Sequence, residues 1–130
     1  MIEFLVDTSV WIDYFRDVGD CNFIDTLIDK NAIVTNDVIL TELIPFIAAK
    51  KEALLEALLR EIKLYPLEIR WEELRSIQGA ALKKGINKIG LPDLIIAQNA
   101  LQNNATLLTG DKHFDLLKKK TNLPLNLYVW

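Results

Sequence analysis

Short apolar runs alternate with longer segments of helical periodicity, and this alternation restricts the fold more than any other feature of the sequence. The runs have the length of buried strands and lie at residues 2–6, 32–35, 64–69, 106–109 and 125–130. Strands that alternate with helices form βαβ units, whose strands are parallel and are covered by helices on both faces. The sequence therefore predicts an α/β protein with a mostly parallel sheet.

The segments between these runs carry apolar residues at three- and four-residue intervals, which is the spacing of helices. Gly85 follows Lys83 and Lys84, a pattern typical of a helix end, and Pro92 suits the first position of the next helix. Pro45 lies inside a predicted helix and is expected to kink it. The predicted helices cover residues 10–15, 23–28, 38–47, 54–62, 71–82, 92–103 and 114–119.

Size and composition limit the class of protein. The 130 residues predict one domain over residues 1–130, and 51% hydrophobic residues are enough for one core. The net charge of −3 excludes an overall basic surface, so that any polyanion would need local basic patches. The single cysteine, Cys21, excludes a disulfide framework and a cysteine-rich metal site and fits a reducing compartment. With neither a secretion signal nor a run of about 18 apolar residues, we expect a cytoplasmic protein without a membrane span.

Asp7 is the first candidate for chemistry, because it ends the first apolar run and directly precedes a helix. Open parallel sheets place their ligands at the carboxyl ends of strands, where such a residue lies. Asp7 also fits a turn or a helix cap, which are common roles of aspartate. The hydroxyls of Thr8 and Ser9, which follow it, are suited to holding a ligand or water and equally to turn chemistry.

Two further acids lie on predicted helices. Glu42 falls in an apolar stretch between Val38 and Phe46, at the edge of the buried stripe, where it needs a partner or bends to water. Asp93 follows Pro92 at a helix start, where an acid favours the helix dipole. Because Asp93 also heads the apolar stripe of its helix, we expect its side chain to point toward the sheet.

Asp111 lies just past the fourth predicted strand, and Asp115 follows one helical turn later. Crossover connections in a parallel sheet bring all the carboxyl ends of the strands to one edge, so Asp7 and Asp111 belong to the same rim, within reach of Glu42 and Asp93. Acids gathered there would repel one another unless cations held them. Oxygen ligands select Mg²⁺ or Mn²⁺, as one ion or two, and such a site would act on a phosphodiester. Four independent helix caps are the alternative.

The sequence resembles the PIN-domain ribonucleases, and most closely the VapC toxin component of VapBC toxin-antitoxin pairs. Four segments carry the resemblance in order and over nearly the whole chain, and each contains one of the acids. They are residues 4–11 (FLVDTSVW), 40–43 (LTEL), 91–97 (LPDLIIA) and 107–114 (LLTGDKHF).

The resemblance implies a three-layer α/β/α fold with a five-stranded parallel sheet and a Mg²⁺- or Mn²⁺-dependent endoribonuclease. It implies metal-binding and catalytic carboxylates, an auxiliary acid at Asp115, and supporting hydroxyls at Thr8 and Thr109. The implied partners are an RNA substrate, a second copy in a homodimer, and a small VapB-like antitoxin that inserts a segment into the active-site groove. The metal-binding and catalytic carboxylates would be Asp7, Glu42, Asp93 and Asp111.

The residues that bind substrate are less clearly marked. Candidates are Arg16, Lys84, Lys112 and His113, although lysines are common on solvated surfaces and a lone histidine also suits a capping role. Two other classes of protein, a phosphoacceptor signalling domain and a haloacid-dehalogenase-like phosphatase, require a second acid near Asp7, and this sequence has none there. The strongest alternative is a PIN-like module that binds RNA or protein without cutting.

Overall fold

The computed structural model describes residues 1–130 and contains one five-stranded sheet in which every neighbouring pair of strands is parallel. The strand order is β3-β2-β1-β4-β5. The predicted parallel α/β sheet is therefore confirmed. The strands are β1 (Phe4–Val6), β2 (Ile33–Thr35), β3 (Lys63–Leu64), β4 (Thr106–Thr109) and β5 (Asn126–Val129).

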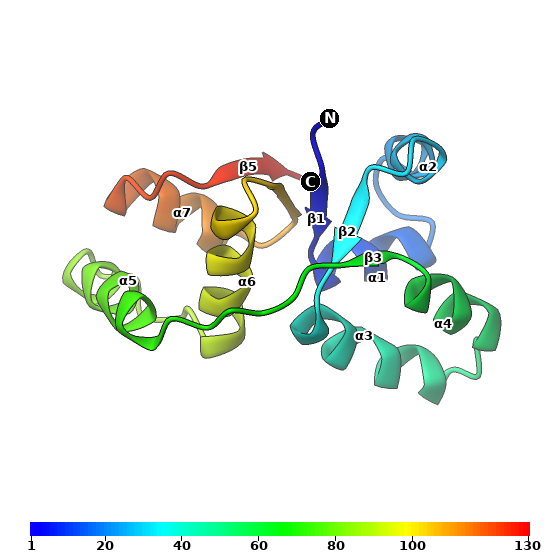
Figure 1. The fold of residues 1–130 in the computed structure, drawn as a ribbon, viewed down its shortest axis with the longest axis horizontal. Coiled ribbons are helices and arrows are strands. Elements are labelled where there is room, and N and C mark those ends of the chain that lie inside the picture. The colour runs from blue at the N-terminus through cyan, green and yellow to red at the C-terminus, as the bar shows by residue number, and fades with distance from the viewer.

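Seven helices cover the two faces of the sheet, with α1 to α4 gathered on one side of β1 and α5 to α7 on the other (Figure 1). This division follows from right-handed crossovers, because the chain moves outward from β1 in one direction and from β4 in the other. The helices are α1 (Thr8–Phe15), α2 (Cys21–Asp29), α3 (Asp37–Ala49), α4 (Ala53–Arg60), α5 (Trp71–Lys83), α6 (Leu91–Gln102) and α7 (Lys112–Thr121).

The core lies on both faces of β1 and β4, whose apolar residues are fully buried. Leu5, Val6, Leu107 and Leu108 each have 0% exposure, as expected for central strands covered on both faces. A second, smaller cluster joins α5, α6 and α7. The two clusters hold both helical layers rigidly against the sheet and so fix the carboxyl ends of β1 and β4.

The third predicted strand is much shorter than expected. The run 64–69 was predicted as a strand, but only Lys63 and Leu64 pair with β2, at the edge of the sheet. Pro66 has no N–H to donate, so the ladder cannot continue through it. Side chains of α6 hold the following segment instead: the Asn99 amide donates to the Pro66 carbonyl at 3.0 Å, and Gln102 to that of Glu68 at 2.8 Å.

Other element boundaries differ by a few residues. Helix α7 begins earlier and ends later than the predicted 114–119, because Asp111 caps its start and Asn122 ends it in the left-handed conformation. Helix α6 begins at Leu91, so Pro92 takes the second helical position. Helix α3 continues past Pro45. No helix has both the length and the apolar character required to cross a membrane.

Candidate functional site

Asp7 lies at the carboxyl edge of the sheet, between β1 and β4, where the order of the strands reverses. It directly follows β1 and begins α1, yet its side chain caps no helix amide. Only 6% of Asp7 is exposed, and its Oδ2 accepts hydrogen bonds from Thr109 Oγ1 at 2.8 Å and from Ser9 Oγ at 3.1 Å. The carboxylate is thus held in place by two hydroxyls, and the simple capping role is not observed.

Thr109 and Ser9 tie this carboxylate to the loop that follows β4. Thr109 Oγ1 accepts from the backbone N–H of Asp111 at 3.0 Å, and Ser9 Oγ accepts from the N–H of Gly110 at 3.2 Å. Each hydroxyl therefore donates to Asp7 and accepts from the backbone of the loop that follows β4. These contacts fix the separation between the β1 and β4 ends of the site.

Burial raises the pKa of Asp7 above its ordinary value, since a charged carboxylate loses hydration there. Hydrogen bonds from Thr109 and Ser9 oppose this shift, whereas the negative charge of Asp111 adds to it. A buried carboxylate that is destabilised as an anion gains from a nearby cation more than an exposed one does.

Glu42 reaches the site from α3. Glu42 is exposed, and its Oε1 accepts a hydrogen bond from Thr8 Oγ1 at 2.9 Å. The partner that Glu42 was expected to need is thus a hydroxyl on α1 rather than a lysine or bulk water alone. Helices α1 and α3 pack side by side, and the Thr8–Glu42 bond joins them near the carboxyl edge of the sheet.

Asp93 occupies the first turn of α6 and is partly buried. Burial is the largest cause that raises its pKa, and a hydrogen bond from the Gly90 backbone opposes the shift. Three neighbouring negative charges raise the pKa further, namely those of Asp111, Asp7 and Glu42. The four acids of the sequence motifs therefore lie close enough to sense one another's charge.

Asp111 has a local role as well. Its Oδ1 accepts from the backbone N–H of His113 at 2.9 Å, which caps α7, and the Nδ1 of the same histidine lies 2.9 Å from that oxygen. His113 thus contacts the acid rim directly. Asp115 pairs with Lys119 at 2.9 Å, within α7. The second oxygen of Asp111 makes no such contact.

The donor set of the rim consists of carboxylates and hydroxyls, which suits a hard divalent ion such as Mg²⁺ or Mn²⁺ better than zinc. The side chains nevertheless form no ready-made group of three or more acidic, histidine or cysteine ligands that could hold a metal ion.

The proposed substrate-binding residues are not all gathered at the rim. Arg16 lies at the end of α1 with its guanidinium 6.0 Å from the centre of the Phe46 ring, Lys84 ends α5, and Lys112 begins α7 beside Asp111. None of these three cations pairs with a carboxylate.

Buried amides, for which the sequence pattern gives no specific role, position the helices that carry Glu42 and Asp93. Asn36 caps α3 and donates to Asn99 Oδ1 at 2.9 Å, and Gln98 bonds both backbone groups of Arg70 at 3.1 Å. Asn99 and Gln98 are each 1% exposed. Their position in the otherwise apolar run of α6 is the signal that marks them, since buried amides require partners.

Thr109→Val should weaken the site, and Thr35→Val provides a matched control. Both threonines are 1% exposed at strand ends, but Thr35 Oγ1 has no hydrogen-bond partner. Loss of the Thr109 hydroxyl leaves the Asp111 N–H without its partner and should cost about 1–3 kcal/mol of unfolding free energy, whereas Thr35→Val should be neutral or stabilising. Chemical denaturation measures both, and equal losses would contradict the assigned role of the Thr109 hydroxyl.

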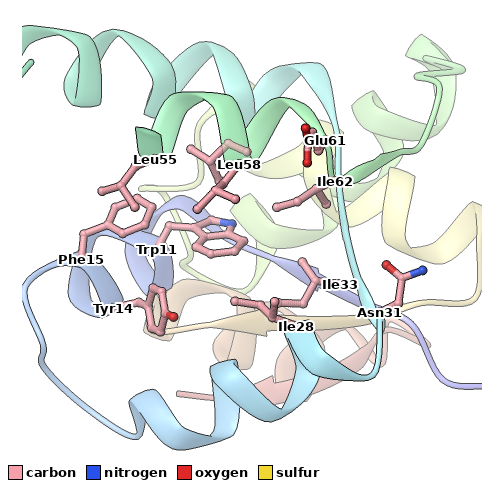
Figure 2. Close-up of a pocket in the computed structure, with 11 residues that line it drawn as sticks. Trp11, Tyr14, Phe15, Ile28, Asn31, Ile33, Leu55, Leu58, Glu61 and Ile62 are labelled. Carbon is pink, nitrogen blue, oxygen red and sulfur yellow. The ribbon is translucent and has the colours of Figure 1, made fainter. Parts of the chain in front are cut away.

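A second feature is an apolar groove between α1, α2 and α4 (Figure 2). Its volume is about 300 Å³, and nine of its eleven lining residues are hydrophobic. Trp11 forms the floor, and its buried indole N–H has no hydrogen-bond partner. Leu58 on α4 is 54% exposed at the rim. The groove lies beside the first turns after Asp7 but contains none of the four motif acids.

The sequence matches the model of a known protein family. The PIN domain family model matches residues 4–120. No curated protein sequence matches the chain.

Solved structures share the fold over nearly the whole chain. VapBC2 from Rickettsia felis, bound to a DNA fragment from their promoter, has 24% identity and a TM-score of 0.72, covering 100% of this chain and 99% of that chain. DNA-bound VapBC from Salmonella typhimurium has 17% identity and a TM-score of 0.76 at the same coverage. FitAcB from Neisseria gonorrhoeae has 20% identity and a TM-score of 0.69 and covers 96% of each chain.

Proposed function

Because the chain belongs to the PIN domain family, we propose that it is a divalent-metal-dependent endoribonuclease that hydrolyses RNA phosphodiester bonds. The observation that carries the proposal is the position of Asp93, which is partly buried and within range of the charges of three other motif acids; burial raises its pKa, and those charges raise it further. Acids from four separate segments of the chain thus act on one another at one edge of the sheet. The proposed metal-binding and catalytic residues are Asp7, Glu42, Asp93 and Asp111.

These carboxylates suit Mg²⁺ or Mn²⁺, because such ions prefer oxygen ligands. A cation would also neutralise the charges of Asp7 and Asp93, which burial destabilises. When bound, such an ion supplies polarisation of the phosphate and activation of water. Thr109 and Ser9 hold Asp7 in one orientation, and Thr8 does the same for Glu42. Asp115 is proposed as an auxiliary acid, which it can become once it leaves Lys119.

A cleavage assay tests the proposal. Purified protein incubated with structured RNAs and Mn²⁺ or Mg²⁺ should produce internal cuts, and excess EDTA should stop them. A matched single-stranded and double-stranded DNA panel determines the preference for RNA. Cleavage that persists in EDTA would remove the metal from the mechanism, and the absence of cleavage of any RNA with either ion would contradict the enzymatic proposal.

We further propose that the protein is the toxin of a toxin-antitoxin pair in the cytoplasm and that residues 1–130 form a single domain. The solved neighbours named above are VapBC and FitAcB complexes. The apolar groove supports an antitoxin partner, because the exposed acid Glu61 lines it and the exposed acid Asp25 accepts a hydrogen bond from Tyr14 of its lining. A basic, amphipathic antitoxin segment would match both the apolar floor and this charge.

We also propose that the protein forms a homodimer. Helices α5 and α6 expose Trp71, Leu82 and Leu91 by 51%, 56% and 50%, and all three line one open apolar surface. Exposed apolar side chains gathered on one face favour association with a second copy. Light scattering on the purified protein measures this state directly.

Leu58→Glu should abolish antitoxin binding without unfolding the protein. Leu58 is 54% exposed, so a glutamate there keeps its hydration in the free protein but would be buried in the complex beside Glu61. Loss of at least 100-fold in affinity is expected, which is about 2.7 kcal/mol or more. Leu116→Glu, at a 39% exposed site on α7, is the matched control. Affinity for a candidate antitoxin from a neighbouring gene is measured for both variants, and unchanged binding by Leu58→Glu would exclude the groove.

A further inference from the structure

The aromatic ring of Phe46 lies between two cations on the surface formed by α1 and α3. Lys50 Nζ is 4.7 Å from the ring centre, and the guanidinium of Arg16 is 6.0 Å from it. Phe46 is partly buried against the core, whereas Arg16 and Lys50 are exposed. These distances are those of cation–π contacts.

Phe46 lies one helical turn beyond Glu42 on the same face of α3, about 6 Å along the helix axis. Glu42 in turn bonds Thr8 at the start of α1, and Arg16 extends from the other end of that helix. A ligand that leaves the acid rim along the line where α1 meets α3 therefore passes Phe46 next.

The two cations have no acidic partner. The chain carries 18 acidic residues, yet neither Arg16 nor Lys50 forms an ion pair. Their positive charges contact only the face of an aromatic ring, a contact of about 0.5–1 kcal/mol at an exposed site. Both charges are thus available to an anion.

An RNA substrate needs such cations near the rim. The motif acids repel phosphate, and with a net charge of −3 the protein supplies no general attraction for a polyanion. Aromatic rings flanked by lysine and arginine are the surfaces on which single-stranded nucleic acids bind, since a base stacks on the ring while cations contact the phosphates.

We propose that Phe46, Arg16 and Lys50 form a nucleotide-binding subsite for single-stranded RNA, in which a base stacks on the Phe46 ring and the two cations bind the adjoining phosphates. Lys50 leaves the ring when the base takes its place, which its exposed, flexible side chain permits. The inference rests on the proposed function, because it concerns the strand on which the acid rim acts.

RNA binding without cleavage tests the subsite. Fluorescence anisotropy with a short, fluorescein-labelled single-stranded RNA of mixed sequence is measured in EDTA over a range of salt concentrations. Phe46→Leu should weaken binding about 5- to 150-fold with an unchanged salt dependence, because it removes a stacking surface and no charge. Phe46→Trp should retain the affinity and establishes that the position tolerates another aromatic ring.

The charge variants give a different signature. Lys50→Gln and Arg16→Gln should each reduce the slope of log affinity against log salt by about 0.7, the value expected for one lost phosphate contact on a single strand. Lys30→Gln is the control, since Lys30 ends α2 and precedes β2, at the amino edge of the sheet. It should leave affinity and slope unchanged.

Either of two results would overturn the subsite, namely unchanged RNA affinity in Phe46→Leu or equal loss of affinity in Lys30→Gln and Lys50→Gln. If wild-type protein still cleaves RNA with Mn²⁺, the proposed function then stands alone. If Phe46→Leu keeps its RNA affinity but loses antitoxin binding, the ring belongs to a protein contact instead. Failure of the proposed function is seen separately, as the absence of cleavage by wild-type protein.

Discussion

Asp93→Asn should abolish metal-dependent RNA cleavage while the protein remains folded. The side chain keeps its shape but loses the charge that would bind the ion, at an acid whose pKa is raised by burial and further by the three other carboxylates. Charge stabilisation by a bound ion contributes several kcal/mol to catalysis, so the rate should fall by about 1,000-fold or more. The loss is measured as the single-turnover cleavage rate of the variant relative to wild-type protein, on an RNA that the wild-type protein cleaves.

Asp37→Asn is the matched control for this variant. Asp37 also lies in the first turn of a helix, but it is exposed and lies outside the four acidic motif segments. Any effect of losing a favourable helix-dipole interaction is therefore shared by both variants, whereas loss of the proposed metal site is not. Full activity in purified Asp93→Asn would exclude a catalytic role for this carboxylate.

Much of the fold could be predicted from the pattern of apolar residues. Strands β1, β2 and β4 lie within the predicted runs, because central strands of a parallel sheet are buried on both faces and read as continuous apolar segments. The pattern failed at β3. The run after Lys63 is apolar enough for a strand, but Pro66 ends the pairing and α6 amides hold the segment that follows. Periodicity does not distinguish a strand from an extended segment that side chains hold.

The candidate site could be predicted only in outline. Parallel topology alone places Asp7 and Asp111 at one edge of the sheet, which the observed strand order bears out. The contacts that orient the acids were not predictable, because they join residues far apart in the chain. Thr109 meets Asp7 across 102 positions, and Thr8 meets Glu42 across 34. Such pairs depend on strand register and helix packing, which a single sequence does not specify residue by residue.

The free energy of unfolding should fall as the pH rises through the raised pKa values of Asp7 and Asp93. Burial raises the pKa of both Asp7 and Asp93 in the folded protein, so between the ordinary value near 4 and the raised values the folded state binds more protons than the unfolded state. The contribution of these two acids is therefore fully present below the ordinary value, and it is lost as the pH rises through the raised values. Metal-free protein should show this loss relative to an Asp7→Asn, Asp93→Asn double variant.

A divalent ion should reverse this loss at neutral pH, because it binds the folded state and neutralises the same carboxylates. At a metal concentration 100 times the dissociation constant the gain is about 2.7 kcal/mol, which raises the melting temperature by about 10 °C in a domain of this size. Thermal unfolding with and without Mn²⁺ measures it, and the double variant should show no shift. Equal shifts in both proteins would mean that the ion binds elsewhere. If instead neither protein responds at millimolar metal, the acids do not form a metal site on their own, and the proposed chemistry would require RNA to complete it.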